Sequence, residues 1–137
     1  MDSILPALQL GLPHLIGQFA ATLGLLGLGI AAYMTLTPFH ERRLIRDGNV
    51  AAGVVLAGTL VALAIPLAAT LAVNVLLLDI VVWGLVALVI QLATFLAASA
   101  LIRNLRDMIE AGNVAAALVL VGLELAVALL NAGAMAG

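Results

Sequence analysis

The sequence predicts an all-α integral membrane protein, a four-helix bundle built from two parallel, same-orientation two-helix repeats. Three features predict it: the composition, the placement of the charges and a doubled stretch of sequence. The 137-residue chain is 66% hydrophobic and only 9% charged, whereas a soluble domain has about 25% charged residues. Because each membrane crossing requires about 20 apolar residues, the composition indicates several spans.

The charged residues gather in two short stretches, HERRLIRDGN at 40–49 and RNLRDMIEAGN at 103–113. These stretches divide the chain into long apolar segments, each able to cross a hydrocarbon core of about 30 Å. Membrane β-strands would instead alternate in polarity over about ten residues. The sequence therefore predicts four membrane helices, at about 13–38, 50–73, 75–101 and 114–130.

The stretch GNVAAGVVLAG at 48–58 returns as GNVAAALVLVG at 112–122, and the same shift aligns Arg42 with Arg106. Each half therefore contains a helix, an arginine-containing loop and a second helix. Because a repeat with two spans keeps its direction, both copies have the same orientation. The predicted division is an outer-facing segment at 1–12, a first repeat at 13–73 and a second repeat at 74–137.

Small residues recur at helical spacing in the first and third predicted helices. Close approach across small residues is a main reason for membrane helices to associate. We expect these two stripes to be contact faces within the chain, with contacts between chains of a homo-oligomer as the alternative. The stripes are Gly17, Ala20, Gly24, Gly27 and Ala31, and Gly84, Ala87, Gln91, Thr94 and Ala98.

The second and fourth helices each begin after a Gly-Asn pair. Asn49 and Asn113 are predicted N-caps, because an asparagine side-chain oxygen accepts from an otherwise unpaired backbone N–H of the first turn. Gly48 and Gly112 suit the positive φ that closes a preceding helical turn. The loops also contain three oppositely charged pairs at helical spacing: Arg43 with Asp47, Arg103 with Asp107, and Arg106 with Glu110.

Polar residues inside the spans have both structural and functional interpretations. Pro66 is expected to kink the second helix and free a carbonyl for a neighbour or an ion. Asp79 and Trp83 are expected to anchor the start of the third helix at the interface. Four amides are expected to form hydrogen bonds between helices, namely Gln18, Asn74, Gln91 and Asn131.

Glu124 is the most informative residue, because it lies near the middle of the fourth helix. An ionised side chain there costs at least ~2.5–3.5 kcal/mol on insertion scales. One hypothesis is that Glu124 binds a proton, a cation or a cationic substrate, with Asn131, Asp79 and Asn74 as further candidate polar residues. The alternative is a protonated, hydrogen-bonded structural carboxyl group. Its counterpart in the first repeat is Leu60, so the repeat itself does not require an acid.

The positions of the arginines predict the orientation. All five lie in the two charged loops, and positive residues are retained in the cytoplasm. The loops are therefore predicted to be cytoplasmic and both termini periplasmic. No basic residue precedes the first apolar part, so we predict no cleaved signal.

Several function classes are not supported by the sequence. The chain has no cysteine, and neither His14 nor His40 has a partner at ligand spacing, so we assign no metal and no cofactor. There is no nucleophile elbow, phosphate loop or HExxH motif, and we expect no enzymatic activity. The arginines form no basic stripe, so we expect no nucleic-acid partner.

The chain resembles the YjfL-like family of small bacterial inner-membrane proteins, a domain of unknown function. The resemblance rests on RDGNVAAGVVLAG followed by AIPLA, on LLLDIVVWGLVALVIQL, and on IEAGNVAAALVLVGLELAVALLNAGAM. Glu124 lies outside the family motif. The motif positions are Gly48, Asn49, Asp79, Trp83, Gly84, Gly112, Asn113 and Asn131.

The resemblance implies two tandem two-helix repeats in the inner membrane and supplies no catalytic residue. Family genes often lie near membrane-stress genes of the phage-shock type, which implies membrane-stress protein partners. Together with the small-residue stripes, this favours a non-enzymatic multi-pass component that assembles in the bilayer and supports an envelope or membrane-stress module. The alternative is a small ion channel or a proton-coupled transporter that uses Glu124.

Overall fold

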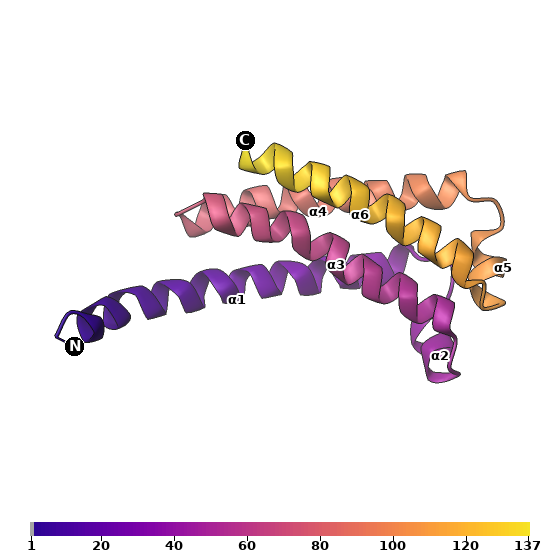
Figure 1. Cartoon of the computed structure of the whole chain (residues 1–137), viewed down its shortest axis with the longest axis horizontal. Helices are drawn as coiled ribbons and strands as arrows, with labels where there is room; N and C mark the ends of the chain where they lie inside the picture. Colours follow the sequence, from indigo (N-terminus) through magenta and orange to yellow (C-terminus); the bar gives the residue numbers. More distant parts are fainter. Residues whose placement is uncertain (1) are drawn as a thin grey trace.

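The computed structural model describes residues 2–137, and Figure 1 shows them as an elongated bundle of helices. Four helices are long and apolar enough to cross a membrane. The predicted all-α, four-helix membrane bundle is therefore confirmed. Its elements are α1 (Ile4–Leu36), α2 (Glu41–Arg46), α3 (Val50–Val73), α4 (Leu77–Leu101), α5 (Leu105–Glu110) and α6 (Val114–Ala136).

Both short helices, α2 and α5, lie at the same end of the bundle, and the two chain termini lie toward the other end (Figure 1). The helix α3 begins and ends where the sequence predicts and continues through Pro66. By contrast, α1 begins at Ile4 and not near residue 13. Pro13 lies inside α1 because a proline removes only one backbone donor, and neighbouring groups compensate for that loss in membrane helices.

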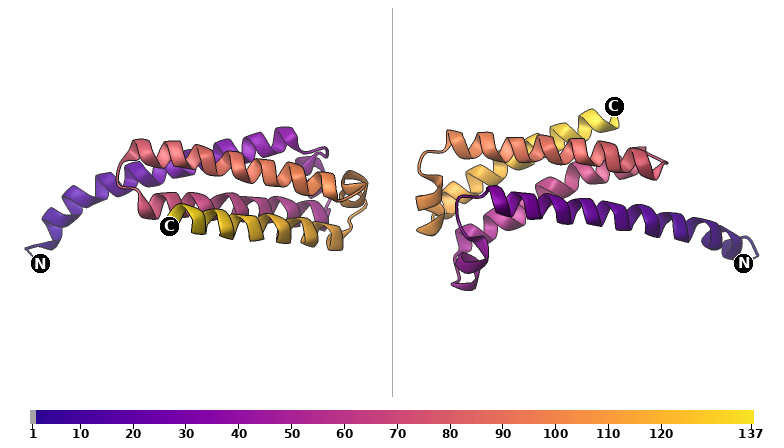
Figure 2. Two further views of the ribbon diagram at one scale, coloured as in Figure 1. Left: turned by 90° about the horizontal axis from the view of Figure 1, so that it is seen from above. Right: turned by 180° about the vertical axis from the view of Figure 1, so that it is seen from behind.

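The closest pairing in the bundle is between α3 and α6, which lie side by side along their length (Figure 2). Gly58 makes this approach possible, because a Cβ atom there would overlap the side chain of Val121. On the other side, α1 packs against α4. A Cβ atom on Gly84 would come within 2.6 Å of the Leu25 side chain, so this second contact also depends on a missing side chain.

The two small-residue stripes have different surroundings. In α4, Gly84, Ala87, Gln91 and Ala98 are buried, which confirms that stripe as a contact face. The expectation for α1 was wrong, because all five stripe residues are exposed. No other part of the described chain lies within 4 Å of a Cβ atom built on Gly17, Gly24 or Gly27. Instead, α1 buries Leu25, Gly29 and Tyr33, which form a stripe on another face.

The two Gly-Asn pairs have the same local geometry. Both glycines have a φ of 82°, a left-handed conformation that favours glycine. The Asn49 side chain accepts from the Ala52 N–H at 3.0 Å, and that of Asn113 accepts from the Ala116 N–H at 3.1 Å. The asparagines therefore cap α3 and α6, while the repeat as a whole stays a prediction.

The Asn49 amide also donates to the backbone carbonyl of Ile109 at 2.8 Å. This bond ties the start of α3 to α5, across the two charged loops. Of the three charged pairs expected in these loops, residues 2–137 form only the one between Arg106 and Glu110, with 3.1 Å between Nε and Oε1. Both side chains are exposed, so the pair contributes little.

Candidate functional site

Glu124 is buried between α6 and α3, with only 1% of its surface exposed. Its carboxyl group is hydrogen-bonded to the Thr59 hydroxyl, whose oxygen lies 3.2 Å from one carboxyl oxygen and 3.0 Å from the other. The α6 face that contains Glu124 is buried along its length because it packs against α3 and α4. Glu124 is therefore an interior residue and does not face lipid.

Within residues 2–137, the carboxyl group of Glu124 has no cationic partner. Across residues 2–137, no arginine or histidine nitrogen lies within ion-pair distance of its oxygens. An unpaired charge in such an interior is costly, and one hydroxyl compensates only part of that cost.

Two amides extend the polar region from Glu124 toward the α3–α4 turn. The Gln91 Nε2 donates to the backbone carbonyl of Glu124 at 2.9 Å. Further along, the Asn131 Nδ2 donates to the Ala87 carbonyl at 3.4 Å and to the Gln91 Oε1 at 3.5 Å. Both amides link α4 to α6, as the sequence predicts.

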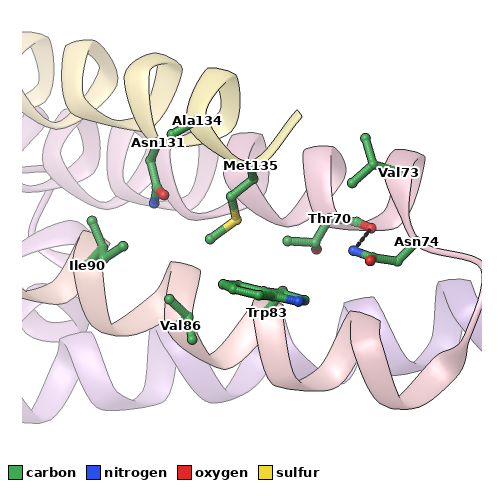
Figure 3. A pocket seen from close by; sticks show the side chains of 9 residues that line it. All are labelled: Thr70, Val73, Asn74, Trp83, Val86, Ile90, Asn131, Ala134 and Met135. Atoms are coloured by element: carbon green, nitrogen blue, oxygen red, sulfur yellow. Dashed lines mark hydrogen bonds between the residues drawn. The ribbon is translucent and has the colours of Figure 1, made fainter. Parts of the chain in front are cut away.

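A cavity of about 300 Å³ lies beyond Asn131, between α3, α4 and α6. In Figure 3, Asn131 and Asn74 lie on either side of this space, with Trp83 between them. The Asn74 Nδ2 donates to the Thr70 carbonyl of its own helix at 2.8 Å. No hydrogen bond from the Asn74 side chain to another helix is formed within residues 2–137, so that expectation was wrong. The cavity is lined by Thr70, Val73, Asn74, Trp83, Val86, Ile90, Asn131, Ala134 and Met135.

Two buried residues extend the polar region in the opposite direction, toward α2. Tyr33 is fully buried, and its ring packs edge-on against Phe95 with 4.8 Å between ring centroids. Within the described chain, neither the Tyr33 Oη nor the Glu41 Oε1 has a hydrogen-bond partner.

Glu41 belongs to the charged stretch at 40–49, and the sequence pattern did not distinguish it from its neighbours as an interior residue. Only 3% of its surface is exposed. The preceding Phe39 is also buried, so the chain turns inward before α2 begins. The shift that aligns the two repeats places Glu41 on Leu105, which is buried at the start of α5. That apolar counterpart was the signal that could have identified Glu41 as an interior residue.

The structure thus brings together part of the predicted site and adds to it. Glu124 and Asn131 belong to one buried row, and Asn74 lines the cavity at its end. Asp79 lies in the first turn of α4 and does not line this cavity. We call the buried row the polar row and define it as Glu41, Tyr33, Thr59, Glu124, Gln91 and Asn131.

The polar row offers hydroxyl, carboxyl and amide groups only. Within the described part of the chain, no three histidine, aspartate or glutamate side chains gather where they could hold a metal ion. The row contains two carboxyl groups, those of Glu41 and Glu124, which are the groups in it that can bind a proton.

Comparison with known proteins agrees with the description of the chain as a membrane protein. A family model described as Domain of Unknown Function (DUF350) matches residues 7–135. Two curated relatives carry the name UPF0719 inner membrane protein YjfL, from Escherichia coli strain K12 and from E. coli O157:H7. Each is 35% identical over 103 residues, which cover 75% of this chain and 78% of the relative. No solved structure matches the chain significantly.

Proposed function

Because the chain belongs to the DUF350 family of membrane proteins, we propose that it is a non-enzymatic, multi-pass component of the bacterial inner membrane that assembles with copies of itself. The inner-membrane location is proposed from the names of its E. coli relatives. We further propose that the assembly supports an envelope or membrane-stress module, as the resemblance to the YjfL-like family implies. In this proposal the α2 and α5 loops face the cytoplasm, because they contain all the arginines.

The observation that supports self-assembly most directly is the outward-facing stripe of α1. Gly17, Gly24 and Gly27 leave an open, flat strip of backbone on the outside of the bundle. The first half of α1 extends past the end of the other helices (Figures 1 and 2), and α1 is the least buried of the four long helices. Small residues let helices approach closely in a membrane, so a second copy of α1 would fit against this strip.

Step counting on single molecules in lipid nanodiscs tests self-assembly. The full chain is labelled with one fluorophore, and the expected result is more than one bleaching step per particle. Gly24→Leu should shift the population toward one step, because the added side chain fills the strip. Gly11→Leu is the matched control on the opposite face of the same helix and should leave the step number unchanged. Single steps for the unsubstituted chain would contradict self-assembly.

A second candidate function is proton-coupled exchange at Glu124. It is favoured by one observation, the burial of a carboxyl group whose only side-chain partner in residues 2–137 is the Thr59 hydroxyl. If the role of Glu124 is purely structural, an amide at this position would serve as well as the carboxyl group. Proton flux into proteoliposomes therefore separates the two roles. The exchange function predicts flux that Glu124→Gln abolishes, whereas a purely structural Glu124 predicts no difference between the two proteins.

A further inference from the structure

We propose that the cavity between α3, α4 and α6 binds the head of a neutral membrane lipid, a planar ring with hydroxyl groups of the hydroquinone class. The cavity has a volume of about 300 Å³, at the lower end of the range of about 300–1,000 Å³ for ligand pockets. It lies at the end of the bundle away from α2 and α5 (Figures 1 and 3). Such binding requires neither self-assembly along α1 nor proton exchange at Glu124, because neither α1 nor Glu124 lines the cavity.

The wall of the cavity reaches from the bundle interior to its surface. On the inner side, Thr70 and Asn131 are buried. On the outer side, four large lining side chains are exposed, and in a membrane this surface faces the lipid. They are Val73, Trp83, Val86 and Ile90. A ligand can therefore enter sideways from the bilayer, with a polar head directed inward and an apolar tail left among the lipids.

The lining residues favour a neutral head. No charged side chain lines the cavity among the described residues. An ion or a phosphate-bearing head would lose its hydration there without gaining a counterion, which is costly. The polar groups that do line it are one hydroxyl and two amides, from Thr70, Asn74 and Asn131. Such groups recognise a neutral partner through hydrogen bonds.

The hydrogen bonds already formed at the cavity show which partner is missing. The Thr70 hydroxyl donates to the Leu67 carbonyl at 2.8 Å, and the Asn74 Nδ2 donates to the Thr70 carbonyl at 2.8 Å. The Asn131 Nδ2 donates to two oxygens of α4. By contrast, neither asparagine Oδ1 accepts a hydrogen bond within residues 2–137. A matching head therefore donates hydrogen bonds, as hydroxyl groups do.

Trp83 offers a flat surface to a ring. In Figure 3 its indole is seen edge-on, and Met135 lies across the space from one face of the indole. Aromatic rings associate in offset-stacked or edge-to-face geometry, and a methionine sulfur makes favourable contacts with rings. Because Asn131 and Asn74 lie on either side of the same space, a ring with hydroxyl groups at opposite edges can donate to both.

The dimensions of the cavity agree with a single ring. Its wall on α4 runs from Trp83 to Ile90, seven residues that span about 10 Å at 1.5 Å per residue. A phospholipid acyl chain is the main alternative occupant. It would leave the oxygens of Asn74 and Asn131 without hydrogen bonds next to apolar atoms, and buried polar groups without partners are unfavourable. The free acceptors therefore favour the hydroxyl-bearing ring over the chain.

The test uses the fluorescence of Trp83, which is the only tryptophan of the chain. The full chain in lipid nanodiscs is titrated with a bromohydroquinone that carries a decyl tail, because bromine quenches indole fluorescence at short range. Quenching should saturate, as expected for a binding site. The dimethyl ether of the same compound keeps the ring and the bromine but has no O–H donor. It should bind at least about fivefold more weakly, since two hydrogen bonds are lost.

Substitutions in the cavity test the contacts one by one. Asn74→Ala and Asn131→Ala should each weaken binding about two- to tenfold, as expected for the loss of one hydrogen bond. Ala134→Phe places a ring in the cavity and should abolish saturable quenching. Ala136→Phe is the matched control, because Ala136 is exposed about 200° further around α6 and does not line the cavity. It should bind the probe as the unsubstituted chain does.

Three results would overturn the proposal. Quenching that rises linearly without saturation would show a probe dissolved in the lipid only. Equal binding of the hydroquinone and its dimethyl ether would show that the asparagine oxygens do not select a hydroxyl donor, and this comparison needs no substitution. In a separate titration, phospholipids with brominated acyl chains replace the probe. Quenching by these lipids that Ala134→Phe removes and that unbrominated decylhydroquinone does not displace would identify an acyl chain as the occupant.

Discussion

The hydroxyl oxygen of Thr59 on α3 lies 3.0 and 3.2 Å from the two carboxyl oxygens of Glu124 on α6. This contact joins the two helices that pack most closely, and it provides the only side-chain partner of the buried acid within residues 2–137. Removing the Thr59 hydroxyl therefore weakens the α3–α6 contact and also leaves the Glu124 carboxyl group without its hydrogen bond.

Thr59→Val is expected to destabilise the bundle by about 1–3 kcal/mol, because it leaves a buried carboxyl group without a partner. The measurement is reversible unfolding in mixed micelles with increasing denaturing detergent. Thr94→Val is the matched control, since the Thr94 hydroxyl donates to the Ile90 carbonyl of its own helix. Equal stability losses in the two variants would contradict a special role for the Thr59–Glu124 contact.

Glu124→Leu is expected to change stability little or to increase it, while Thr59→Val lowers it. Replacing a buried charged or polar group by a well-packed apolar one is often neutral or stabilising. Leucine is also the residue at the aligned position 60. The same micelle unfolding measures this effect. A large loss of stability in Glu124→Leu would show that the carboxyl group holds the bundle together.

Gly58→Ala is expected to destabilise the protein by about 1–3 kcal/mol, because the new methyl group overlaps Val121 and overpacks the α3–α6 contact. Gly122→Ala is a matched control, since it lies at the aligned position of the second repeat and its Cβ would have no neighbour within 4 Å. Alanine favours helix by about 1 kcal/mol over glycine, so this control should be neutral or stabilising. Similar effects at both positions would contradict the described α3–α6 packing.

Asn49→Ala is expected to cost more stability than Asn113→Ala. Both substitutions remove an N-cap, which costs about 1 kcal/mol. Only Asn49 also donates to carbonyl groups of α5, those of Ile109 at 2.8 Å and Glu110 at 3.3 Å. Hydrogen exchange of the α5 backbone should therefore increase in Asn49→Ala and stay unchanged in Asn113→Ala. Equal exchange in both variants would argue against a tie between the loops.

The parts of the fold that could be predicted from the sequence are those set by helix-capping residues and by composition. The Gly-Asn pairs placed the starts of α3 and α6 correctly, because glycine with a positive φ and an asparagine cap have local causes. The length of the apolar segments gave the number of spans. The predicted start of α1 was wrong, because a proline such as Pro13 is typical of a helix boundary. The helix α1 continues through it.

Which helix faces lie inside was harder to predict. The long helices are apolar all around, so periodicity alone does not distinguish the interior from the lipid side. The α1 stripe therefore looked like an internal contact, while the buried face is the one with Leu25, Gly29 and Tyr33. Glu124 could be found because a charge in an apolar run is conspicuous. Glu41 was missed because it lies among other charges.

The central claim is that copies of this chain meet along the outward strip of α1. The chain has no cysteine, so a single Gly24→Cys substitution gives an unambiguous cross-linking site in native membranes. Gly24→Cys should form a disulfide-linked dimer, whereas Gly11→Cys on the opposite face of α1 should form none. Equal cross-linking at both positions, or none at Gly24→Cys and Gly27→Cys, would contradict it.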